Sequence, residues 1–216
     1  MPQFHGGTLT AIKWASVVLM VLDHLDGFVY GGALGLHATV GRLVFPVFGF
    51  LLAYNAARPR ALLDGVHGRM MWRTLLVGVL ALPVYVPLAG WYPLNIMFSL
   101  ALGVLVINAC AHGDRFGLVV VGLFALVAGA FVDYQWFGLA YMLAVWGAYA
   151  RGWSPWWILA GAVSLWPING NLVAVLALPL LWLASQLRLD LPRHQLAFYA
   201  VYPAHLLAIG AVLYLG

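Results

Sequence analysis

Charged side chains are scarce in this sequence, and that scarcity excludes most classes of water-soluble protein. Asp, Glu, Lys and Arg make up 7% of the 216 residues, whereas hydrophobic residues make up 65% and the mean hydropathy is +0.98. A soluble domain of this length needs far more polar surface than these residues provide. The composition therefore predicts a membrane protein. The net charge of +4 implies no nucleic-acid partner, because basic residues in a membrane protein chiefly report its orientation.

Cysteine is nearly absent as well, since Cys110 is the only one in the chain. A single thiol can form neither an internal disulfide nor a multi-cysteine metal site, so we expect Cys110 to pack as a small hydrophobic side chain. The sequence also lacks a zinc-ligand spacing, a Walker loop, a serine nucleophile elbow and a dinucleotide-binding glycine pattern. We therefore predict that the protein uses no metal.

Apolar segments separated by proline, glycine and charge predict the fold class. We expect an all-α integral membrane protein, a bundle of about nine transmembrane helices that forms one domain over residues 1–216. The predicted spans are roughly 11–30, 40–57, 71–90, 94–111, 116–132, 136–150, 154–167, 171–186 and 196–215. The first is too long and too acidic for a signal peptide, so we expect it in the mature protein. The short spans 136–150 and 154–167 either tilt or form one hairpin.

The basic residues predict the orientation of this bundle. With a cytoplasmic N-terminus, nine of the ten lie at cytoplasmic ends of spans. These are Lys13, Arg58, Arg60, Arg69, Arg73, Arg115, Arg151, Arg188 and Arg193. Arg42 is the exception at the outer end, where we expect Asp23, Asp26 or Asp133 to attract it; an interfacial anchor is the alternative. We also expect Pro46 to bend the span 40–57 and to open space beside Arg42.

Asp23, His24 and Asp26 lie inside the first predicted span, where ionisable residues mark a functional site by default. At 1.5 Å per residue, His24 lies roughly 16 Å beyond Lys13 and past the midplane of a core of ~30 Å. Asp23 and Asp26 are i, i+3 neighbours, whereas His24 points to another side, so only a partner helix can bring the three together. A histidine beside a carboxylate is a plausible general base. The alternative is a polar clamp between helices.

Other polar residues lie at the ends of later spans or within them. Arg69 and Arg73 are one helical turn apart, a geometry that can clamp phosphates, although basic residues there also serve as topology signals. Asn95 either caps the span 94–111 or belongs to a site. In the last span, Tyr202 and His205 continue a polar stripe at i+3 spacing.

Together these segments resemble the TraX family of conjugative-pilin acetylases. The matching blocks are Met20-Val21-Leu22-Asp23-His24, Gly41-Arg42-Leu43-Val44-Phe45-Pro46-Val47-Phe48, Arg73, Leu94-Asn95-Ile96-Met97-Phe98, and Tyr199 with Tyr202-Pro203-Ala204-His205-Leu206. They occur in the family's order and extend over nearly the whole chain. The resemblance implies a multi-pass acetyltransferase of the bacterial inner membrane that uses acetyl-CoA and is related in layout to transmembrane acyltransferases.

Residue chemistry and resemblance together give the predicted site. We expect catalysis by His24, Asp23 and Asp26, substrate binding by Arg42, Asn95, Tyr202, His205 and Asp133, and binding of acetyl-CoA phosphates by Arg58, Arg69 and Arg73. The acceptor would be a pilin N-terminal amine or an envelope glycan at the outer face. Transfer is either direct or through an acetyl-histidine. Membrane lipid is a further expected partner, and a homodimer is a candidate assembly.

Two other classes of function compete with this interpretation. A proton-coupled transporter or channel would use the Asp, His and Arg residues as a midplane ion site, but the sequence shows no inverted repeat. A scaffold for a pilus or envelope complex would explain the aromatic spans but not the buried charges. Coenzyme A bound to the purified protein would favour the acetyltransferase over both.

Overall fold

The computed structural model of the protein describes residues 1–192 and 195–215, so Arg193 lies outside the described residues. Within them the chain is helical and forms no strand beyond one isolated bridge, between Leu94 and Val132. The helices are α1 (Gly6–His24), α2 (Val44–Ala56), α3 (Val66–Ala89), α4 (Ile96–His112), α5 (Arg115–Ala128), α6 (Gln135–Arg151), α7 (Trp156–Ser164), α8 (Trp166–Asn169), α9 (Ala177–Ser185) and α10 (Gln195–Leu215). The predicted all-helical class is confirmed.

Three helical segments among the described residues are long and apolar enough to cross a membrane. They are Gly6–Val29, Val66–Ala89 and Ala197–Leu215. The other predicted spans correspond to α-helices of 9 to 17 residues, below the ~20 residues that a straight span needs. Membrane-length helices are therefore present, while nine full spans stay a prediction.

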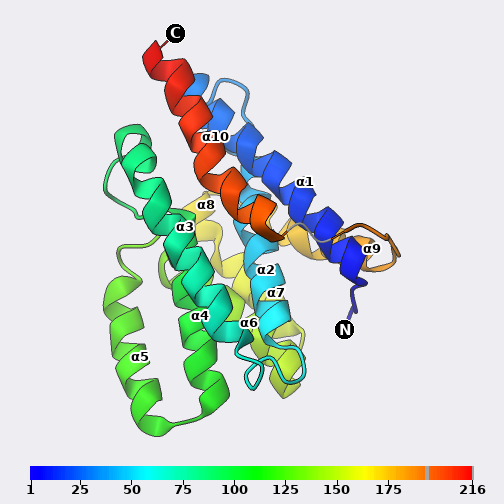
Figure 1. The fold of residues 1–216 in the computed structure, drawn as a ribbon. Helices are drawn as coiled ribbons and strands as arrows, with labels where there is room; N and C mark the ends of the chain where they lie inside the picture. The colour runs from blue at the N-terminus through cyan, green and yellow to red at the C-terminus, as the bar shows by residue number, and fades with distance from the viewer. Residues whose placement is uncertain (193–194, 216) are drawn as a thin grey trace.

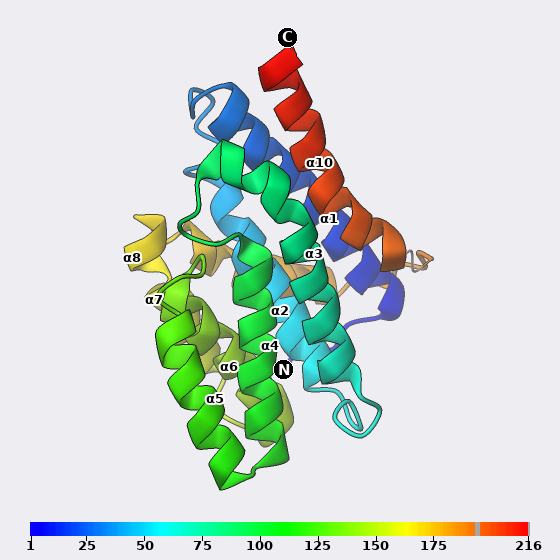
Figure 2. The same cartoon turned by 60° about the vertical axis from the view of Figure 1, so that its left-hand side comes forward.

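The long helices α1, α3 and α10 group on one side of the molecule, next to a second group around α2, α4 and α6 (Figures 1 and 2). α3 packs against α4 and α10, and α2 packs against α4 and α6. This arrangement brings α10, the last helix, beside α1, the first (Figure 1). The fold thus joins residues from opposite ends of the chain.

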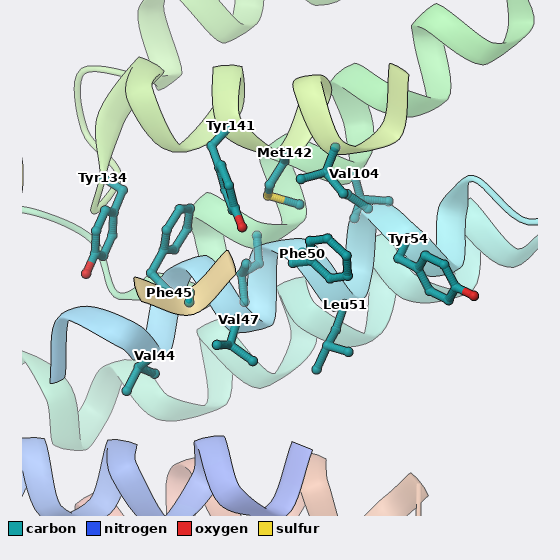
Figure 3. Packing of buried hydrophobic residues seen from close by; sticks show 14 of the residues in the cluster. Val44, Phe45, Val47, Phe50, Leu51, Tyr54, Val104, Tyr134, Tyr141 and Met142 are labelled. Atoms are coloured by element: carbon teal, nitrogen blue, oxygen red, sulfur yellow. The ribbon is translucent and has the colours of Figure 1, made fainter. Parts of the chain in front are cut away.

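The hydrophobic core forms around α2, most of whose residues are buried. Figure 3 shows Phe45 and Phe50 of α2 packed near Tyr141 and Met142 of α6. Gly103 lets α4 approach α6 closely, because a Cβ atom on Gly103 would lie 2.4 Å from the Met142 sulfur. The tight core fixes α2, and with it the segment that precedes it.

That segment corrects one expectation. Residues Val40–Leu43 form a 3₁₀-helix that leads directly into α2, and Pro46 is the third residue of α2. Proline is tolerated in the first turn of an α-helix, where the N–H groups have no partner within the helix. Pro46 therefore removes no hydrogen bond from within α2, and the expectation that it bends the span 40–57 in this way is wrong.

The two ends of the bundle differ in charge. The loop between α2 and α3, which carries Arg58 and Arg60, lies at the same end as the turn before Arg115 (Figures 1 and 2). We call this the basic end. The connection from α1 to α2 and the C-terminus lie at the opposite end (Figure 1). A common end for these arginines is what the orientation prediction requires.

Candidate functional site

The first part of the site is a pair of histidines on α1 and α10. Nδ1 of His24, the last residue of α1, lies 2.6 Å from Nε2 of His205. Nδ1 of His205 lies 2.9 Å from the carbonyl oxygen of Val201. The ring of Tyr202 makes an edge contact with that of His205, with 5.5 Å between centroids. The partner helix that His24 requires is therefore α10.

After His24 the chain changes from an α-helix to a π-helical turn, Leu25–Val29. Asp26 lies in this turn and is fully buried. Its two carboxylate oxygens accept backbone N–H groups of Leu34 at 2.8 Å and His37 at 2.9 Å. Since π-turns often occur at functional sites, the change of helix type is a further mark of this region. Asp26 itself anchors the loop that follows.

That loop places His37 between Asp23 and Arg42. Nδ1 of His37 lies 2.7 Å from Oδ1 of Asp23, and its Nε2 lies 3.3 Å from Nη2 of Arg42. The hydrogen bond to Asp23 raises the pKa of His37, although partial burial opposes the shift. Arg42 is thus linked to Asp23 through a histidine rather than directly. Sequence reasoning did not include His37 in the site, and its spacing of five residues from Arg42 was the only signal.

Asp133 lies on the connection between α5 and α6, which is joined to the start of α4. The backbone N–H of Asp133 donates to the carbonyl oxygen of Leu94 at 3.0 Å, and the hydroxyl of Ser99 donates to the carbonyl oxygen of Asp133. Burial raises the pKa of the Asp133 carboxyl to about 6, against a hydrogen bond from the Tyr134 N–H and the positive charge of Arg42. Asp133 is therefore an enclosed carboxyl group close enough to Arg42 to interact with its charge.

Arg42 retains an unused donor, because its buried Nε has no hydrogen-bond partner among the described residues. Asn95, in contrast, is fully engaged in packing. Its Oδ1 accepts the N–H of Met97 at 3.1 Å and so caps α4, and its Nδ2 donates to the carbonyl oxygen of Gly78 on α3 at 3.1 Å. The structure shows a helix cap at Asn95, as one of the two interpretations of its sequence position predicted.

The second part of the site is a cleft of about 490 Å³ between α1, α2, α3, α4 and α10, which we call the basic cleft. Its lining includes Lys13, Val17, Met20, Asn55, Arg58, Arg69, Arg73, Val77, Leu100, Tyr199 and Tyr202. The cations lie toward the basic end, and Arg73 holds its guanidinium over the Tyr199 ring at 5.9 Å. The three predicted phosphate-binding arginines therefore line one cavity.

The other end of the basic cleft lies next to the histidine pair. Met20 is one helical turn before His24 on α1, and Tyr202 is about one turn before His205 on α10. From Lys13 to Met20 the wall of the cleft extends about 10 Å along α1 at 1.5 Å per residue. A ligand held by the arginines can thus extend along apolar side chains toward the two histidines.

These features define a helical protein in which three helices of membrane-spanning length enclose part of a basic cleft that leads to a histidine pair. In the described residues, no group of His, Cys, Asp and Glu could hold a metal ion. The chain belongs to the TraX protein family, whose sequence model matches residues 8–213. Membership links it to the acetylation of conjugative pilins. No curated protein and no solved structure matches the chain.

Proposed function

We propose that the protein is an integral acetyltransferase of the bacterial inner membrane. It moves an acetyl group from acetyl-CoA on the cytoplasmic side to an acceptor at the outer face. Membership of the family suggests a pilin N-terminal amine as this acceptor, and an envelope glycan is the other candidate. The observation that carries the proposal is the basic cleft, because it extends from a cluster of arginines to Met20 and Tyr202, each about one helical turn from the paired His24 and His205.

The residues of the basic cleft suit coenzyme A, which combines phosphates with a long, mostly uncharged arm. Arg58, Arg69 and Arg73 would hold the phosphates, since guanidinium groups bind phosphate oxygens with two parallel hydrogen bonds. Phosphates are too costly to move into lipid, so they stay at the basic end. The apolar wall beside Val77 and Leu100 would accept the arm and direct its thioester toward the histidines.

His24 supplies the base in this proposal. Acetyl-CoA brings a thioester, whose carbonyl carbon the acceptor nitrogen attacks while His24 takes the proton from that nitrogen. The new C–N bond forms, the C–S bond breaks, and the proton on His24 passes to the leaving thiolate. The negative charge of Asp23, the preceding residue, stabilises the imidazolium. The alternative route uses His24 as a nucleophile and passes through an acetyl-histidine.

The residues around His24 have supporting roles in the same proposal. Asp26 holds the loop of residues 30–39 through two backbone hydrogen bonds and acts on the chemistry only through that loop. Arg42 has an unused N–H donor and, with Asp133 nearby, would bind polar groups of the acceptor. The predicted catalytic and substrate-binding residues thus separate into one base and the groups that position it and its substrate.

Binding of acetyl-CoA to the purified protein tests the cleft. The double variant R69E/R73E should bind acetyl-CoA more than about tenfold more weakly in a calorimetric titration, and the difference should shrink at high salt. R115E is the matched control, since Arg115 is exposed at the same end but does not line the cleft. Unchanged affinity of the double variant would return both arginines to the role of topology signals. No binding to the wild type would favour a transporter or channel.

Sealed vesicles of known orientation test the direction of transfer. Labelled acetyl-CoA offered only on the side of the α2–α3 loop should label an acceptor peptide confined to the opposite side. The reason is that the basic end and the α1–α2 connection lie at opposite ends of the bundle (Figure 1). If labelling occurs only when both substrates are on the side of the α2–α3 loop, transfer across the membrane is wrong.

A further inference from the structure

We infer that His205 is a positioning residue that fixes the tautomer of His24, leaving Nε2 of His24 unprotonated and available to the acceptor. The catalytic consequence of this inference rests on the proposed function. The tautomer itself does not, because it follows from the hydrogen bonds of the pair.

The first step is the protonation of His205. A backbone carbonyl oxygen can only accept a hydrogen bond, so Nδ1 of His205 must carry the hydrogen that bonds to Val201 at 2.9 Å. A neutral imidazole has one N–H group. Nε2 of His205 is therefore an acceptor, and it is this nitrogen that faces His24.

The second step is the protonation of His24. Its Nδ1 lies 2.6 Å from the acceptor Nε2 of His205, so Nδ1 of His24 must donate. The ring planes are within 10° of each other, and the centroids are 4.9 Å apart, much farther than the two nitrogens. The rings therefore meet edge to edge, with the hydrogen near both ring planes. Nε2 of His24 then carries the lone pair, whether it acts as base or as nucleophile.

The ring of His205 is held in a fixed position. His205 is 8% exposed, and its own ring is held by Val201 on one side and packed against Tyr202 on another. When His24 takes a proton at Nε2, its Nδ1–H still donates to His205, so the bond survives the proton transfer. His205 thus sets which nitrogen of His24 is protonated, as the hydrogen-bond partners of catalytic and metal-bound histidines do.

The test reads the tautomer of His24 by NMR of protein with ¹⁵N-labelled histidine in detergent, at mildly alkaline pH where the rings are neutral. The His24 signals are assigned from their loss in H24Q. We expect wild-type His24 to carry its hydrogen on Nδ1. H205L removes the acceptor and should shift His24 toward the form protonated at Nε2, whereas H205Q retains an acceptor oxygen and should preserve the wild-type form.

H112L is the matched control. His112 also has its Nδ1 bonded to the carbonyl oxygen four residues earlier, that of Asn108 at 2.9 Å, but it ends α4 at the basic end of the bundle. Its replacement should leave the His24 signals unchanged. Wild-type His24 protonated at Nε2 would overturn the inference without any variant. An unchanged His24 tautomer in folded H205L would also overturn it.

Acetyl transfer measured on the same variants separates this inference from the proposed function. H205L should lower kcat about 10²-fold, the typical contribution of a positioned proton-transfer group, and leave the KM for acetyl-CoA unchanged, because His205 does not line the basic cleft. H205Q should restore kcat to within about tenfold of wild type. A tautomer shift in a protein that transfers no acetyl group would support the positioning role and refute the proposed function. Normal turnover in H205L would overturn the positioning role.

Discussion

Replacing Gly41 with alanine should break the contact between Asp23 and His37. A Cβ atom on Gly41 would lie 2.1 Å from Oδ1, 2.5 Å from Cγ and 3.1 Å from Cβ of Asp23. No carbon tolerates another atom at the first two distances, so the Asp23 carboxyl must rotate away. Oδ1 is the atom that contacts Nδ1 of His37 at 2.7 Å, and the rotation removes this bond.

The expected cost follows from overpacking. Inserting one methyl group into a packed site typically destabilises a protein by about 1–3 kcal/mol. The lost bond between Asp23 and His37 adds less than about 1 kcal/mol to this, because His37 is half-exposed and solvent screens the pair. The pKa of His37 is raised in the folded protein, so this part of the stability is present at low pH and lost as pH rises through that pKa.

Two measurements check this prediction: the free energy of unfolding in detergent, and an NMR titration of His37. In G41A the pKa of His37 should fall toward its ordinary value, and the stability gap to the wild type should narrow as pH rises. G27A is the control, since a Cβ atom on Gly27 meets nothing within 4 Å. A wild-type titration of His37 in G41A would refute the reasoning, because it would mean that Asp23 had not moved.

Three further predictions concern the same region. H24A should abolish acetyl transfer while the protein remains folded and inserted, and near-normal turnover would exclude His24 as base or acyl carrier. D26N should cost about 1–3 kcal/mol, because asparagine keeps only one acceptor oxygen and its amide nitrogen cannot accept the other of the two backbone N–H groups, those of Leu34 and His37; faster hydrogen exchange at one of these two amides would show the loss. The free energy of unfolding of the wild type should fall as pH rises toward about 6, since the raised pKa of Asp133 makes the folded state bind its proton more tightly. D133N should remove this dependence of stability on pH. An equal dependence in D133N and the wild type would contradict the raised pKa of Asp133.

The sequence by itself was enough for the class and the family. Scarce charge and repeated apolar segments predict helices, because only helices satisfy their own backbone hydrogen bonds in lipid. The positions of Arg58, Arg69 and Arg73 relative to those segments also placed them at one end of the bundle, where the structure has them lining one cleft. Such local patterns need no knowledge of which helices touch. The motif blocks around His24 and His205 were sufficient to indicate the TraX family.

The lengths of the helices followed less well from composition. Apolar segments predicted about nine spans, and three helices reach membrane length among the described residues. The predicted span 171–186 shows why an apolar segment can contain a shorter helix: it divides into a 3₁₀-helix, Val173–Leu176, and the nine-residue α9. Hydrophobicity is a property of residues, whereas helix length also depends on the turns that packing imposes.

Only the tertiary structure decided the partners of the polar residues. His24 and His205 are 181 residues apart, and they meet because α10 packs against α1. Sequence spacing offered Asp23 and Asp26 as partners of His24, but the carboxylate of Asp26 is used by the following loop and that of Asp23 by His37. Spacing along one helix determines which side chains share a face, and it leaves open which distant helix lies against that face. A hydrogen bond between helices depends on that packing, and therefore the sequence named most residues of this site, His37 excepted, while the fold determined how they are paired.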